Sequence, residues 1–138
     1  MKISKSRKSN LVKELRYVAE KMKSTDNVHE KLFYFSAIYG EVNRIINYEY
    51  DPELVLVHQI FNTGYNTIMA NLSSNQQGTG IITIPPNLFK KLQDTIYVLA
   101  DNIESNRNIY KELEEVSNLA YSTSGNGYYL YLKGIIKI

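Results

Sequence analysis

The spacing of apolar residues between Asp51 and Leu72 constrains the fold of this chain more than any other feature. Large side chains recur there in alternating steps of four and three residues, with one histidine among them: Leu54, His58, Phe61, Tyr65, Ile68 and Leu72. Such steps place every member on one stripe of an α-helix. Further apolar residues beside the stripe widen it. We therefore expect a central helix that packs on more than one side.

Similar spacing predicts helices in four other segments, at residues 11–22, 32–46, 88–103 and 109–120. The sequence does not decide whether the last two are continuous. Asp51 is suited to capping the central helix, and Pro52 to its first position. This junction is short, so the central helix should form an antiparallel hairpin with the one before it. Gly40, in the middle of that earlier helix, indicates a close helix crossing. The fold class is mainly α: an antiparallel bundle of four to five amphipathic helices.

A minor two-stranded β element is the alternative addition to this bundle. Ile81–Ile84 is a short β-branched run, and residues 128–138 are rich in aromatic and β-branched side chains. The tail pattern favours a strand paired with Ile81–Ile84, and a last short helix is the other interpretation.

Charge divides the chain into two parts. Residues 1–23 hold eight basic and two acidic side chains, whereas the remaining residues are net acidic. Residues 1–8 are expected to form a flexible basic arm, with Ser9 or Asn10 capping the first helix. Residues 9–138 then form a single helical domain, within the size range of one domain.

Composition and patterning exclude several classes of protein. The chain has no cysteine, which removes disulfides and thiol chemistry, and no apolar run approaches the ~20 residues of a membrane span. The basic N-terminus is not followed by the apolar segment of a secretory signal. We therefore expect a cytoplasmic protein that does not insert into membranes.

Two sets of residues are candidate sites. His58 on the central stripe, with Tyr39 and Tyr65 nearby, is a possible core polar site for a small molecule or a metal. No glutamate lies three residues before either histidine, as carboxylate-bridged metal bundles require, so no metal ligands are assigned. Lys2, Lys5, Arg7 and Lys8 are the candidate contacts to nucleic acid or to an acidic protein, because lysine and arginine neutralise phosphates.

The remaining polar patterns do not indicate catalysis. Glu112, Glu114 and Glu115 fit a solvated helix face, and Gly78-Thr79-Gly80 lacks the residues of a phosphate loop. There is no Gly-x-Ser-x-Gly elbow. The sequence therefore favours a non-enzymatic protein and implies no cofactor.

The bundle pattern also invites comparison with known helical families. HEPN-type ribonucleases use an arginine followed four to six residues later by histidine, whereas Arg44 and His58 are fourteen residues apart. The composition, rich in Ile, Tyr, Asn and Lys without Cys or Trp, and the Asp51-Pro52 hairpin resemble small archaeal helical-bundle proteins of unknown function. That resemblance implies no activity and no site residues.

Twelve tyrosines against no tryptophan add a surplus of surface suited to interfaces. Since no set of reactive residues converges, the favoured function is a protein-interaction or scaffold module that acts as a homo-oligomer, such as a homodimer. The alternatives are nucleic-acid binding through the N-terminal residues and ligand binding around His58.

Overall fold

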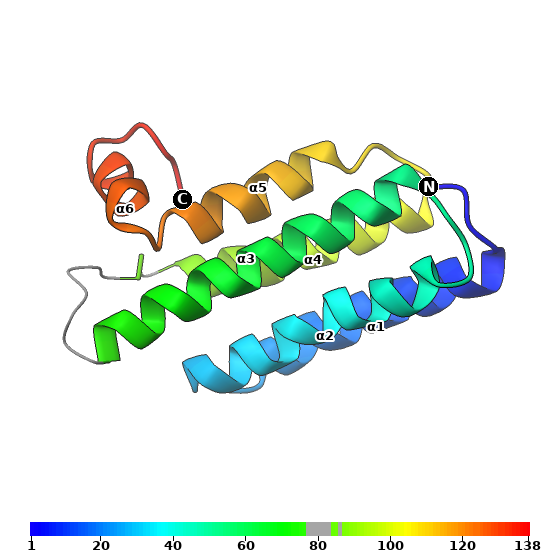
Figure 1. The fold of residues 1–138 in the computed structure, drawn as a ribbon, viewed down its shortest axis with the longest axis horizontal. Helices are drawn as coiled ribbons and strands as arrows, with labels where there is room; N and C mark the ends of the chain where they lie inside the picture. The colour runs from blue at the N-terminus through cyan, green and yellow to red at the C-terminus, as the bar shows by residue number, and fades with distance from the viewer. Residues whose placement is uncertain (77–83, 86) are drawn as a thin grey trace.

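The computed structural model describes residues 1–76, 84–85 and 87–138, in which six helices account for most of the chain (Figure 1). They are α1 (Lys5–Lys23), α2 (Val28–Ile46), α3 (Pro52–Gln76), α4 (Leu88–Glu104), α5 (Tyr110–Tyr121) and α6 (Gly125–Leu132). The mainly α prediction is confirmed. The two segments whose continuity the sequence does not decide are separate helices, α4 and α5.

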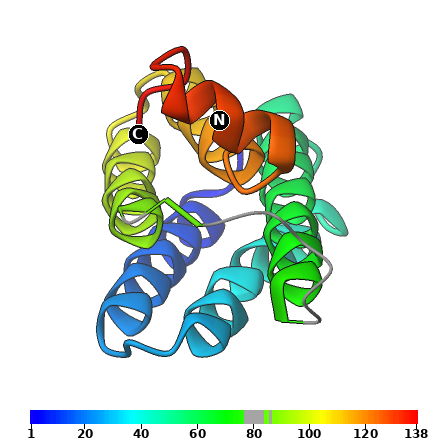
Figure 2. The same cartoon turned by 90° about the vertical axis from the view of Figure 1, so that its left-hand side faces the viewer.

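Five of the helices form a closed ring, which Figure 2 shows end-on. Helix α1 packs between α2 and α4, α3 packs between α2 and α5, and α5 contacts α4 to complete the circle. A ring with an odd number of helices cannot alternate direction at every contact. Figure 1 shows the exception: α3 and α5 run the same way, while the other neighbours are antiparallel. The prediction of an antiparallel bundle is therefore correct for all neighbours but this pair.

The core fills the inside of the ring. Each helix contributes its apolar stripe, and the rings of Phe35 and Phe61 stack there at a centroid distance of 5.3 Å. The buried stripe of α3 differs from the predicted one, because it contains Val57 and Gly64 instead of His58 and Tyr65. Since α3 faces α5 as well as α2, the arc that turns inward is rotated toward α5. His58 and Tyr65 are consequently half-buried at its edge.

The predicted start of α3 is confirmed. Asp51 Oδ1 accepts hydrogen bonds from the backbone N–H groups of Glu53 and Leu54, at 2.9 and 3.1 Å. Pro52, which has no N–H, occupies the first helical position. Burial would raise the pKa of Asp51, but hydrogen bonds from the backbone of Lys2, Leu54 and Glu53 outweigh it and lower the pKa below its ordinary value of 3.8.

The same turn holds the beginning of the chain. The amino group of Met1 donates to Glu53, and the backbone N–H of Lys2 donates to Asp51 Oδ2 at 2.9 Å. The backbone N–H of Ser4 donates to Glu49 at 2.8 Å. Helix α1 begins at Lys5, so the predicted cap at Ser9 or Asn10 is wrong. Residues 5–8, expected in a basic arm, belong to α1, and residues 1–4 are tied to the α2–α3 turn.

The tail part of the expected β element is wrong. Residues 125–132 form helix α6, in which Ser124 accepts a hydrogen bond from the backbone N–H of Gly127 at 3.1 Å. This cap starts a helix where composition alone favoured a strand. Of the proposed partner strand, residues 81–83 lie outside the described residues. Figure 2 shows α6 at one side of the ring, in front of the end of α5, which is the helix it contacts.

A close helix crossing lies at Gly64 and not at Gly40, where the sequence predicted one. Gly40 is exposed, and a Cβ atom built there meets nothing within 4 Å, so it does not mark a close crossing. Gly64 on α3 does lie at one. A Cβ atom there would stand 3.6 Å from Val116 and 3.7 Å from Ala120, at the contact between the parallel helices α3 and α5.

Candidate functional site

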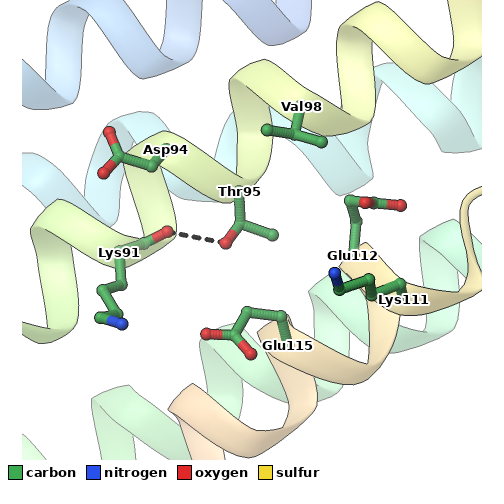
Figure 3. Close-up of a pocket in the computed structure, with 7 residues that line it drawn as sticks. All are labelled: Lys91, Asp94, Thr95, Val98, Lys111, Glu112 and Glu115. Carbon is green, nitrogen blue, oxygen red and sulfur yellow. Dashed lines mark hydrogen bonds between the residues drawn. The ribbon is translucent and has the colours of Figure 1, made fainter.

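A groove with a cavity volume of about 380 Å³ lies on the surface between α4 and α5 (Figure 3). We call it the α4–α5 groove. Its lining residues come from facing sides of the two helices: Lys91, Asp94, Thr95, Val98, Lys111, Glu112 and Glu115. A volume near the lower end of the ~300–1,000 Å³ typical of ligand pockets fits a small molecule.

The turn between α4 and α5 sets the geometry of this groove. Asn106 adopts φ 55°, and the backbone N–H of Arg107 donates back to Asn102 O at 2.8 Å, which ends α4 in a Schellman-type turn. Asn108 then accepts a hydrogen bond from the N–H of Tyr110 at 2.9 Å and starts α5. This compact turn makes the helices antiparallel neighbours and brings their polar flanks opposite each other.

Helical spacing arranges the lining residues in two rows. On α4, Lys91, Thr95 and Val98 follow one another at i, i+4 and i+7, and on α5 Glu112 and Glu115 stand one turn apart. Because the helices are antiparallel, Lys91 lies toward Glu115 and Val98 toward Glu112, as Figure 3 shows. The groove therefore has a polar end and an end with an aliphatic wall.

Glu112 is the most unusual of these residues. The residue is only 8 % exposed, and its buried Oε2 atom accepts no hydrogen bond from the described residues. A buried polar atom without a partner costs about 1–3 kcal/mol, and more when the group is charged. Such atoms are rare in folded proteins and need an explanation. Glu112 therefore has an unmet need for a hydrogen-bond donor.

The other charges of the groove do not meet this need. Lys91 and Lys111 form no ion pair within 4.0 Å among the described residues, and neither does Glu115. The exception is Asp94, which accepts from Lys90 at 3.0 Å. The groove thus presents unpaired cations and unpaired carboxylates side by side.

Thr95 completes the lining. Its hydroxyl donates to Lys91 O at 2.7 Å, so its proton is used within α4 while its oxygen keeps accepting capacity. In the part of the chain that the structure describes, no three carboxylate or histidine side chains converge to hold a metal ion. The arrangement is chemically suited to binding a small polar molecule by charged hydrogen bonds.

The structure brings the predicted core polar residues together. Tyr39 of α2 lies between His58 and Tyr65 of α3, with ring centroids 6.4 and 5.7 Å away. All three are half-buried at the α2–α3 contact, outside the ring core. The Tyr39 and His58 rings meet edge to face, at 86°. This is favourable aromatic packing between neighbouring helices.

Of the four basic N-terminal residues predicted to contact a partner, two already bind groups within the chain and two are exposed. Arg7 donates to Glu49 at 2.8 Å and lies over the ring of Tyr48, and Lys8 donates to Asn106. The hydrogen bond from Arg7 is the main cause that lowers the pKa of Glu49. Lys2 and Lys5 are exposed. Half of the expected phosphate-binding set is therefore already engaged within the chain.

Sequence reasoning missed the α4–α5 groove and assigned Glu112 to a solvated face. A signal was present, because Glu112 lies three residues after Ile109 and four before Val116, at the edge of a buried stripe. The facing row on α4 was not predictable from that spacing.

Comparisons with known proteins add no relative: no family, no curated protein and no solved structure matches this chain. None of the helices in the described ranges has the length and apolarity needed to cross a membrane.

Proposed function

We propose that the protein is a ligand-binding helical module whose site is the α4–α5 groove. The observation that carries this proposal is a cavity of about 380 Å³ whose charged lining residues Lys91, Lys111 and Glu115 form no ion pair among the described residues. A small ligand with complementary charges would pair these side chains and make specific contacts in the groove.

The test is a screen of small charged molecules followed by two-dimensional amide NMR. We expect at least one compound to shift amide signals of residues 91–98 and 111–115 in a saturable way. Val98→Trp fills the groove from a position that is already 45 % exposed, and it should abolish these shifts. Glu114→Trp, at an exposed position of α5, is the matched control and should bind normally. A screen at millimolar concentration that shifts no groove amide contradicts the proposal.

The second candidate function is self-association as a scaffold or interaction module. The supporting observation is a tail surface formed by Tyr129, Leu132 and Ile135, which are 57, 63 and 69 % exposed. Helix α6 buries little of its own apolar surface, and only Gly127 in it is fully buried. Large exposed apolar side chains in one short segment are typical of contact surfaces.

Sedimentation velocity over a range of concentrations tests this second candidate. Self-association through the tail surface predicts a dimer that forms with concentration and is lost in the double variant Leu132→Lys/Ile135→Lys. A wild-type protein that stays monomeric at the highest concentration rules it out.

The two other hypotheses draw less support. Nucleic-acid binding through residues 2–8 would use Arg7 and Lys8, which have internal partners. A site centred on His58 would use rings that already pack against one another.

A further inference from the structure

We infer that the α4–α5 groove recognises a zwitterion of the amino-acid type, with the ammonium group held by Glu112 and the carboxylate held by a groove lysine. This inference rests on the ligand-binding function proposed above and adds the chemical class of the ligand. It follows from the complementary needs of the unpaired groups on the two sides of the groove.

The acidic row requires a donor. Glu112 and Glu115 stand at i and i+3 on α5, where two like charges repel each other. A ligand ammonium between them removes this repulsion by forming charge-assisted hydrogen bonds with both carboxylates. An ammonium has three donors, so it serves both carboxylates. A neutral donor such as a hydroxyl satisfies the hydrogen bond and leaves the repulsion in place.

The basic residues require an acceptor. Lys91 on α4 and Lys111 on α5 both line the groove, and neither has an ion-pair partner among the described residues. A simple amine ligand would place a further positive charge near them. A carboxylate on the same ligand instead neutralises one lysine, and charge-assisted hydrogen bonds of this kind are about twice as strong as neutral ones.

The length of the groove decides which zwitterions fit. Lys91 and Val98 are seven residues apart on α4, which corresponds to about 10 Å along the helix axis. The ammonium site at Glu112 faces Val98, and the polar end of the groove lies at Lys91. A carboxylate on Lys91 suits an extended ligand such as 6-aminohexanoate, whereas a carboxylate on Lys111 suits an α-amino acid. The aliphatic part of either ligand lies against Val98.

Isothermal titration with matched probes tests the inference. The probes are the standard α-amino acids and 6-aminohexanoate, with hexylamine and hexanoate as compounds that lack one charged group. We expect at least one zwitterion to bind, and its two truncated or blocked forms to bind about tenfold more weakly or worse. Glu112→Gln should remove the advantage of the ammonium, and Lys91→Gln or Lys111→Gln the advantage of the carboxylate. Glu114→Gln is the control and should change nothing.

The outcomes separate this inference from the proposed function. Equal binding of hexylamine overturns the carboxylate half, and equal binding of hexanoate overturns the ammonium half. If the NMR screen finds a groove ligand but no zwitterion binds, the inference fails while the proposed function stands. If no compound reaches the groove, both fail.

Discussion

Replacement of Glu112 tests the physical basis of the site without any ligand. In the free protein, Glu112→Gln and Glu112→Met should both raise the free energy of unfolding, with the larger gain for methionine. The glutamine variant keeps the shape of the side chain and removes its charge. The methionine variant also removes the buried oxygen that has no hydrogen bond from the part of the chain that the structure describes.

The magnitude follows from opposing contributions. Relief of a desolvated carboxylate oxygen without a donor is worth about 1–3 kcal/mol. Glu112 lies in the first turn of α5, so loss of its charge also removes a favourable helix-dipole interaction of about 0.5 kcal/mol. Helix propensity does not enter, since Glu, Gln and Met are nearly equal. We expect a net gain of about 1 kcal/mol for glutamine and about 2 kcal/mol for methionine.

Urea unfolding followed by circular dichroism at 222 nm measures this gain, because the chain has no tryptophan for fluorescence. The same substitutions at Glu114, an exposed position two residues along α5, should stay within about 0.5 kcal/mol of wild type. A loss of stability in both Glu112 variants would refute the reasoning, since it would mean that the carboxylate already makes a stabilising contact. With a saturating groove ligand present, wild type should have a higher free energy of unfolding than either Glu112 variant.

Three further perturbations test the fold around the site. Gly127→Ala places a Cβ atom 1.8 Å from Tyr121 O and should displace α6, raising hydrogen exchange in residues 125–132, whereas Gly125→Ala meets nothing within 4 Å and should leave exchange unchanged. Gly40→Ala should stabilise the protein by about 1 kcal/mol in urea unfolding, and a loss would show that the outer face of α2 is packed. The lowered pKa of Asp51 means that its stabilising contribution is present above 3.8 and is lost as the pH falls through the folded-state pKa. Asp51→Asn should therefore lose less stability than wild type between pH 7 and pH 3, and equal losses in the two proteins would contradict this.

The helices were predictable because their signal is local. A spacing of three and four residues reports the buried stripe of one helix, and a capping residue such as Asp51 acts within a single turn. The same locality explains the error at His58. A sequence pattern does not show how far a helix is rotated, and this rotation depends on packing of α3 against both α2 and α5.

The α4–α5 groove could not be predicted from the sequence, for a related reason. It exists because α5 turns back beside α4, so that Lys91 and Glu115, far apart in sequence, face one another. Glu112 looked like one of three solvated acids, although only Glu114 of the three is exposed. The tail was misassigned because its aromatic and β-branched residues favour strands, while the Ser124 cap acts locally to start a helix.

The most direct test of the account is a crystal structure of the protein with the tightest-binding zwitterion from the titrations. The account predicts a ligand ammonium nitrogen within about 3 Å of a carboxylate oxygen of Glu112 or Glu115, and a ligand carboxylate on Lys91 or Lys111. A groove that holds no ligand would contradict it.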